Sequence, residues 1–192
     1  DKANIKGIEK ILNQKNALLM QDDAHGFGIF NPMIPKHSIY MATLGKAAGV
    51  MGAFVAGDED LIEFLIQKSR PYTYTTAIPP SFCNAILTSL KLIDNGEQKQ
   101  KLLTNISYFK SIASQLGLQF GISNSAIQPL VIGSSSAALK LSNQLFEEGF
   151  FVSAIRPPTV PPNTARLRFT LSANHTSQQI NKLLEKVKNV MA

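Results

Sequence analysis

The sequence contains no tryptophan and a single cysteine, Cys83, among its 192 residues. One cysteine cannot form a disulfide within the chain, so the fold must be held together by its core, and a reducing compartment suits such a protein. Cys83 follows Phe82 in an apolar stretch, which predicts a small core residue. No apolar run approaches the length of a membrane span. We therefore expect a cytoplasmic globular protein with no membrane partner.

Acidic residues are also scarce, with 13 Asp and Glu against 19 Lys and Arg, for a formal net charge of +6. This excess raises the possibility of nucleic-acid binding. The basic residues are scattered, however, and no aromatic residues that could stack on bases are interleaved with them. They gather mainly near the two ends, at Lys2, Lys6, Lys10, Lys15, Lys182, Lys186 and Lys188. This pattern predicts the solvated faces of two helices and no nucleic-acid partner.

Hydrophobic spacing predicts alternating helices and strands in the first half of the chain. A helix carrying Ile5, Ile8 and Leu12 comes first. The expected strands are 17–20, 39–42 and 53–56, and the later segments are a helix from Asp58 that ends before Pro71, an extended stretch at 72–77 and a helix from Ser81 to about Ile93. The turn cluster Asp94-Asn95-Gly96 is the clearest break and a candidate domain boundary.

The second half of the chain predicts a compact α+β unit. Its expected elements are a helix at 102–116 stopped by Gly117, a strand at 127–132, a helix at 136–148, strands at 150–155 and 165–171, and a last helix opened by a capping box from Thr176 to Gln179. In the strand at 165–171, apolar residues alternate with Arg166 and Arg168, which predicts one buried face and one face carrying two guanidinium groups.

Two segments carry the residues with chemical potential. Asp22-Asp23-Ala24-His25 and Thr43-Leu44-Gly45-Lys46 each follow a short apolar run that predicts a strand. Open α/β sheets place their ligands at the carboxyl ends of strands. A lysine amine can form a Schiff base with an aldehyde cofactor, and an aspartate can keep a pyridine nitrogen protonated. Gly45, Gly49 and Gly52 would leave the amine room to move, and Thr43 could bind a phosphate.

Simpler interpretations exist for the same residues: a strand-end aspartate, a satisfied histidine and a surface lysine in a flexible loop. A third interpretation is the acidic motif of helicases, which also reads Asp-acidic-Ala-His. It requires an upstream phosphate loop of the form GxxxxGK[ST]. Lys46 is followed by Ala47, and the sequence contains no such loop. The helicase interpretation is therefore weak.

Taken together, five segments resemble the α-oxoamine synthases, pyridoxal-phosphate enzymes with the aspartate-aminotransferase fold. The segments are Asp-Asp-Ala-His-Gly-Phe-Gly at 22–28, Thr-Leu-Gly-Lys-Ala-Ala-Gly-Val-Met-Gly-Ala-Phe-Val-Ala-Gly at 43–57, Ser-Ala-Ile-Gln-Pro-Leu at 125–130, Ala-Ile-Arg-Pro-Pro-Thr-Val-Pro at 154–161 and Thr-Ala-Arg-Leu-Arg at 164–168. The similarity runs over nearly the whole chain and starts in the family's middle. It implies an α/β fold in which 1–94 is the C-terminal part of the large cofactor domain and 95–192 is the small α+β C-terminal domain.

The resemblance also implies roles for individual residues around pyridoxal 5'-phosphate. Lys46 would carry the cofactor and later remove the substrate α-proton. Asp22 would pair with the pyridine nitrogen, and His25 would hydrogen-bond the ring hydroxyl. Thr43 would bind the phosphate, and Thr75 and Thr76 would reach the phosphate of the neighbouring subunit in a homodimer with sites at the subunit interface.

For the substrates, the resemblance implies that Arg168 would hold the amino-acid carboxylate and that Thr159 and Arg156 would lie near the acyl group. A planar guanidinium suits a carboxylate because it can donate two parallel hydrogen bonds. Arg166 is expected to be a solvated strand residue. No metal site is implied.

The segment Arg-Pro-Pro-Thr-Val-Pro at 156–161 favours one activity in this family, the decarboxylative condensation of L-alanine with a pimeloyl thioester in biotin biosynthesis. The thioester could be carried by coenzyme A, which a basic surface would suit, or by a carrier protein. Two alternatives stay open. One is a glycine C-acetyltransferase-type enzyme of the same family. The other is a truncated fragment that dimerises without catalysis, because the resemblance covers the family's second half and lacks ring-stacking and phosphate contacts that its first half supplies.

Overall fold

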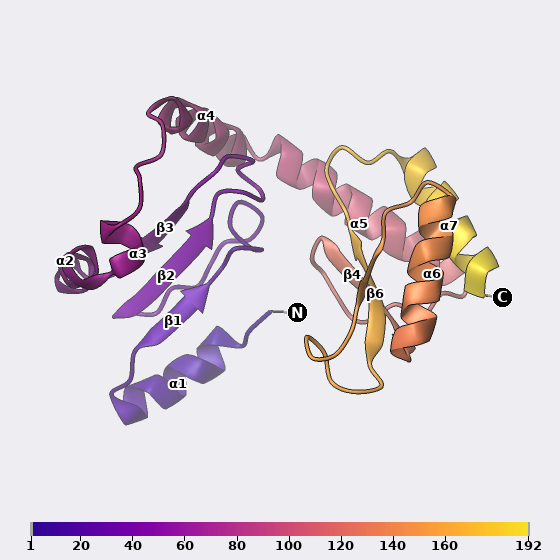
Figure 1. The fold of residues 1–192 in the computed structure, drawn as a ribbon, viewed down its shortest axis with the longest axis horizontal. Coiled ribbons are helices and arrows are strands. Elements are labelled where there is room, and N and C mark those ends of the chain that lie inside the picture. The colour runs from indigo at the N-terminus through magenta and orange to yellow at the C-terminus, as the bar shows by residue number, and fades with distance from the viewer. Residues whose placement is uncertain (1, 192) are drawn as a thin grey trace. The chain divides into compact units, whose positions relative to one another are not determined.

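The computed structural model describes residues 2–191 and divides them into two compact units, Lys2–Glu97 and the unit from Gln98 onward (Figure 1). Residues 1 and 192, the outermost residues of the two expected domains, lie outside the described part. Each unit combines helices with a three-stranded sheet, in agreement with the expected α/β class. In the described part of the chain, no helix is both long and apolar enough to cross a membrane.

The first unit contains three strands and four helices. They are α1 (Ile5–Lys15), β1 (Leu19–Asp22), β2 (Ser38–Thr43), β3 (Ala53–Ala56), α2 (Glu59–Lys68), α3 (Arg70–Thr73) and α4 (Ser81–Asn95). The strand order is β1-β2-β3, in which β1 pairs parallel and β3 antiparallel with the central β2 (Figure 1). All three expected strands are present, with ends shifted by up to two residues.

Strand β2 has the alternating burial of a strand with one face on the core. Ser38, Tyr40 and Ala42 are buried, and the residues between them are half-buried. The ring of Phe54 on β3 lies 5.9 Å from the ring of Tyr40 and 5.3 Å from that of Phe27. Aromatic packing thus closes one face of this sheet.

Two expectations for the first unit were wrong. The stretch 72–77 is not extended throughout, because Tyr72 and Thr73 belong to the short helix α3, which begins at Arg70 and contains Pro71 in its first turn. Proline is well tolerated in the first turn of a helix, where its missing N–H has no partner to lose. Cys83 is exposed and not a core residue, because α4 buries none of its side chains within the described residues.

The break at 94–96 is confirmed as the end of a helix. Gly96 caps α4 with a left-handed φ of 78°, and α5 (Glu97–Gln115) starts at the next residue. Glycine is favoured there because it has no Cβ to clash in this conformation.

The second unit continues with β4 (Ile127–Gly133), α6 (Ser135–Glu147), β5 (Ser153–Ile155), β6 (Ala165–Thr170) and α7 (Ser177–Met191). Its sheet is antiparallel in the order β4-β6-β5. One face of β6 is buried through Ala165, Leu167 and Phe169, and the Phe169 ring packs with those of Phe109 and Phe120. This core supports the opposite face, which carries the two arginines.

Local signals in this unit were confirmed. Gly117 has a φ of 75° after α5, and the capping box is reciprocal: the Thr176 N–H donates to Gln179 Oε1 at 2.9 Å, and the Gln179 N–H donates to Thr176 Oγ1 at 3.2 Å. The strand expected at 150–155 is shorter, since β5 covers only Ser153–Ile155.

Candidate functional site

Four of the expected site residues lie at one edge of the first sheet. Because β1 and β2 are parallel, their last residues, Asp22 and Thr43, lie at the same edge. The chain then turns back from β2 into β3, so the loop that contains Lys46 lies at that edge too. His25 follows Asp22 by three residues, in the turn that leaves β1.

The loop around Lys46 is closed by main-chain hydrogen bonds. The Leu44 N–H donates to the Gly52 carbonyl at 2.8 Å, and the Gly49 N–H donates to the Lys46 carbonyl at 3.1 Å. From α4, the Ser89 hydroxyl donates to the Ala48 carbonyl. The loop is therefore fixed at its base and in its middle, while the Lys46 side chain is exposed.

The turn after β1 packs directly on this loop. A Cβ added to Gly28 would lie 3.1 Å from the Ala47 Cβ and 3.1 Å from the Ile93 Cδ1. Such distances are tighter than ordinary van der Waals contact, so a side chain would require Ala47 and Ile93 to shift, and the φ of 75° at Gly28 also favours glycine. Glycine at this position brings the segment containing Asp22 and His25 against the loop containing Lys46.

Asp22 and Asp23 are neighbours with different environments. Asp22 is exposed, and its Oδ1 accepts a hydrogen bond from the Ala24 N–H at 2.9 Å. Asp23 is half-buried, and its Oδ2 accepts a hydrogen bond from the Tyr40 hydroxyl at 2.8 Å. Burial, and then the hydrogen bond and the negative charge of Asp23, raise the pKa of Tyr40 to about 12. Tyr40 is therefore a neutral donor at ordinary pH.

The hydroxyl of Thr43 is already engaged. It donates to the Gly52 carbonyl at 3.2 Å and accepts from the Gly45 N–H at 3.3 Å. A hydroxyl has one proton to donate. Donation to a phosphate by Thr43 would require the hydroxyl to rotate away from Gly52.

Thr75 and Thr76 follow α3 in an exposed loop. Within the described residues, no side-chain hydrogen bond ties either threonine to the sheet edge that carries Lys46.

The remaining expected residues belong to the second unit. Arg168 lies on the outer face of β6, opposite Pro129 of β4 and Ser153 of β5, and it is exposed. Arg166 lies on the same face, but its guanidinium donates to the carbonyl and hydroxyl oxygens of Thr164 at 3.1 and 3.2 Å. Arg166 is thus committed to a local contact, whereas the described residues offer Arg168 no hydrogen-bonding partner.

Arg156 and Thr159 share one exposed turn directly after β5. The Thr159 N–H donates to the Arg156 carbonyl at 3.1 Å, across the Pro157-Pro158 pair. The turn holds both side chains in a short, locally closed segment.

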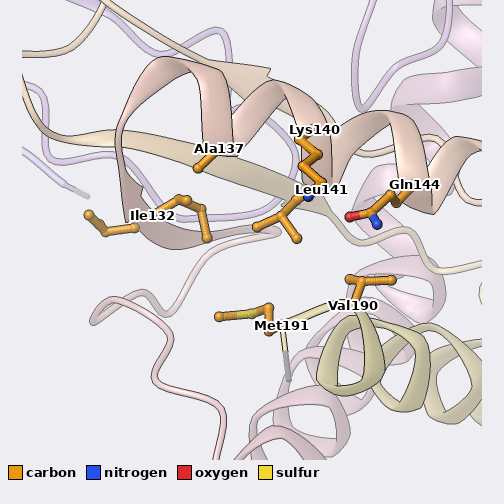
Figure 2. Close-up of a pocket in the computed structure, with 8 residues that line it drawn as sticks. Ile132, Ala137, Lys140, Leu141, Gln144, Val190 and Met191 are labelled. Carbon is orange, nitrogen blue, oxygen red and sulfur yellow. The ribbon is translucent and has the colours of Figure 1, made fainter.

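A pocket of about 330 Å³ lies in the second unit between α6, α7 and the end of β4. Figure 2 shows Val190 and Met191 of α7 across from Leu141 and Gln144 of α6. None of the expected site residues lines this pocket, and within the described residues no group of His, Cys, Asp and Glu could hold a metal ion.

Tyr40 and Gly28 help to build the site, and neither role was predicted from the sequence. Gly28 stood in the quoted motif, but nothing in the sequence revealed its contact with Ala47. Tyr40 was assigned only to an apolar run. The one available signal was the hydroxyl of Tyr40, a polar group within the apolar run expected to form the strand at 39–42.

Comparison with known proteins gives matches over nearly all of the chain. Residues 1–187 match the family described as aminotransferase class I and II. An 8-amino-7-oxononanoate synthase from Hydrogenovibrio crunogenus is 47% identical over 197 aligned residues, which cover 96% of this chain and 50% of the relative. The chain spans about half the length of the curated relatives it matches.

Solved structures agree with this assignment of the fold. The 8-amino-7-oxononanoate synthase of Francisella tularensis superposes with a TM-score of 0.74 and 34% identity, over 89% of this chain and 54% of the other. A serine palmitoyltransferase solved with PLP as internal aldimine gives a TM-score of 0.87 and 26% identity, over 99% of this chain and 51% of the other. The expected α/β fold of pyridoxal-phosphate enzymes is confirmed.

Proposed function

This chain belongs to the class I and II aminotransferase family, and we propose that it forms part of a cytoplasmic 8-amino-7-oxononanoate synthase. The reaction is the condensation of L-alanine with a pimeloyl thioester, with loss of carbon dioxide, in biotin biosynthesis. The observation that carries the proposal is the sheet edge that bears Asp22, Thr43 and the two loops containing His25 and Lys46. The 47% identity to a synthase of that name supports the choice within the family.

The residues at this edge fit pyridoxal phosphate. They comprise an exposed amine on Lys46, an exposed carboxylate on Asp22 and a hydroxyl on Thr43. Gly49 of the Lys46 loop borders open space, because a Cβ added there would meet no atom within 4 Å. A primary amine, a carboxylate and a hydroxyl match the cofactor's aldehyde, pyridine nitrogen and phosphate.

Each side chain then has a distinct task. Pyridoxal phosphate, when bound, withdraws electrons from the α-carbon of the amino acid. Asp22 holds the proton on the ring nitrogen that makes this withdrawal effective, since a carboxylate favours the charged form of a nearby base. His25 hydrogen-bonds the ring hydroxyl. Lys46 would hold the cofactor through its amine, and its Nζ would afterwards take the α-proton of alanine.

We assign the substrate contacts to the second unit. Arg168 binds the carboxylate of alanine, for which it has an uncommitted guanidinium. Thr159 and Arg156 contact the pimeloyl group from their shared turn. On this proposal, 1–94 belongs to the large cofactor domain and 95–192 is the small domain. In a homodimer, Thr75 and Thr76 would bind the phosphate held by the partner subunit.

A substrate matrix tests the proposal in the full-length protein loaded with pyridoxal phosphate. Alanine and glycine are each combined with pimeloyl and acetyl thioesters, and the pimeloyl group is offered on coenzyme A and on a carrier protein. Product from alanine and the pimeloyl thioester alone supports the proposal. Turnover of glycine with the acetyl thioester would make the protein a glycine C-acetyltransferase, and no turnover in a cofactor-loaded dimer would leave a non-catalytic assembly.

A further inference from the structure

The second aspartate of the motif, Asp23, is held by two contacts that the proposed chemistry does not use. Its Oδ2 accepts the hydroxyl proton of Tyr40, whose side chain is 6% exposed. Its Oδ1 packs closely against Gly26, because a Cβ added to Gly26 would clash with that oxygen. The Asp23 carboxylate therefore fills the space between the core of the sheet and the turn.

The turn also depends on the main chain of Asp23. The Gly26 and Phe27 N–H groups donate to the Asp23 carbonyl at 3.0 and 2.9 Å. His25 lies inside this turn, and Asp22 directly precedes it. A contact that holds Asp23 in place therefore also holds the segment that carries Asp22 and His25.

Alternation along the strands separates the two aspartates. Gln21 pairs with Tyr40 and Asp22 pairs with Met41, so Asp22 points to the face opposite Tyr40. Tyr40 does not compete for Asp22. It contacts the turn through its hydrogen bond to Asp23 and, indirectly, through Phe54, whose ring also packs on Phe27. The Tyr40 ring is packed against Phe54, so phenylalanine at position 40 would keep the packing and lose only the hydroxyl.

We propose that Tyr40 is a positioning residue: its hydrogen bond to Asp23 fixes the turn that carries Asp22 and His25 at the sheet edge. The assignment of Asp22 and His25 to the cofactor ring rests on the function proposed above. The fixing of the turn does not. Without the Tyr40 hydroxyl, the half-buried carboxylate of Asp23 would have an unsatisfied oxygen and would favour a more solvated position. The turn would then be held less firmly against the sheet.

The Tyr40→Phe variant of the full-length protein isolates this bond. Amide hydrogen exchange of Gly26 and Phe27, measured without cofactor, should quicken by roughly tenfold, as expected for losing a hydrogen bond to a charged acceptor. Tyr108→Phe is the matched control. It removes the same kind of bond, from the Tyr108 hydroxyl to Asn181 Oδ1 at 3.0 Å, in the second unit. That control should leave exchange at Gly26 and Phe27 unchanged.

The second readout is the visible circular dichroism of bound pyridoxal phosphate, which reports how the ring is held. Tyr40→Phe should alter this signal and slow α-proton exchange, while Tyr108→Phe should alter neither. Unchanged amide exchange in Tyr40→Phe, or an equal change in the control, would overturn the proposal. If Tyr40→Phe does not fold, Asp23→Asn weakens the same bond from its other end and should produce the same pattern of exchange.

The two proposals fail in different ways. A wild-type protein that binds no pyridoxal phosphate would refute the proposed function and leave the exchange result to decide the role of Tyr40. A wild-type enzyme that turns over normally, with a Tyr40→Phe variant that matches it in exchange and dichroism, would refute the positioning role alone.

Discussion

Gly28 approaches Ala47 so closely that a Cβ on Gly28 would lie 3.1 Å from the Ala47 Cβ. This contact couples the segment that carries Asp22 to the loop that carries Lys46. Substitution at Gly28 should therefore damage the site as well as the fold.

We expect Gly28→Ala to destabilise the protein for two reasons: alanine is strained at a φ of 75°, and its methyl group would press on Ala47 and Ile93. Gly96→Ala is the control, because its φ is 78° but nothing lies within 4 Å of the added Cβ. Strain costs both variants about 1–2 kcal/mol, and crowding should cost Gly28→Ala about 1–3 kcal/mol more. Equal denaturation midpoints for the two variants would show that Ala47 and Ile93 can shift to accommodate a methyl group at position 28 without a cost in stability.

Borohydride reduction of the protein loaded with pyridoxal phosphate should leave a pyridoxyl group on Lys46. Mass spectrometry would locate the label on the peptide spanning 43–49. Lys46→Ala should lose the label and turnover while keeping its melting temperature, because the side chain is exposed in a loop. Lys68→Ala, on the exposed surface of α2, should keep both. A label on any other lysine would disprove the assignment.

Asp22→Asn should still bind the cofactor but should lower the rate of α-proton exchange by about two orders of magnitude or more. A neutral amide cannot stabilise a protonated pyridine nitrogen, so the electron sink weakens. Exchange of deuterium into alanine, followed by NMR, measures this rate. Asp60→Asn, which removes an exposed carboxylate from the first turn of α2, should exchange at the wild-type rate. Wild-type exchange in Asp22→Asn would make Asp22 a structural residue.

Arg168→Lys should raise the KM for alanine far more than the KM for the pimeloyl thioester. Lysine keeps the charge but loses the paired hydrogen bonds to a carboxylate, a loss of roughly 1.5–3 kcal/mol, or about one to two powers of ten in binding. Arg166→Lys is the control, because Arg166 is held by Thr164. If only the thioester KM rose in Arg168→Lys, Arg168 would belong to the acyl site.

The raised pKa of Tyr40 predicts a dependence of stability on alkaline pH. A folded-state pKa of about 12, above the usual value near 10, means that folding favours the neutral phenol. That contribution to stability is complete below about pH 10 and is lost as the pH rises toward 12. The difference in phenolate absorbance between wild type and Tyr40→Phe should show one group ionising near pH 12. Ionisation near pH 10 would mean that neither burial nor the contact with Asp23 raises the pKa of Tyr40.

Local signals in the sequence were sufficient for most elements of the fold. Gly96 and Gly117 ended helices where expected, and the Thr176 capping box opened the last one. These signals act over a few residues, so they depend little on the tertiary contacts of the helix. The prediction at Pro71 was wrong because a proline can follow the end of one helix or lie in the first turn of the next. The sequence alone does not distinguish the two.

Contacts between distant segments could not be predicted in this way. The bond from Tyr40 to Asp23 joins residues 17 apart, and it exists only because β1 and β2 pair in one register. Burial was equally hard to foresee. Met20 belongs to the apolar run expected to form a strand, yet it is 62% exposed, and β1 is the edge of its sheet within the described residues. Motif residues could be named from the sequence, whereas the groups that orient them depend on pairing and packing.

Asp22 and Asp23 point to opposite faces of the sheet, so their placement depends more on the number of residues in β1 than on which residues these are. Substitution at Leu19, Met20 or Gln21 leaves the directions of the two carboxylates unchanged. Deleting or inserting one residue between Leu19 and Asp22 would reverse their parity, turning one aspartate toward the Tyr40 side and the other away from it. Among natural and laboratory variants of this chain, the first three positions of β1, Leu19–Gln21, should therefore tolerate exchanges of side chain, whereas single-residue insertions and deletions should not be tolerated.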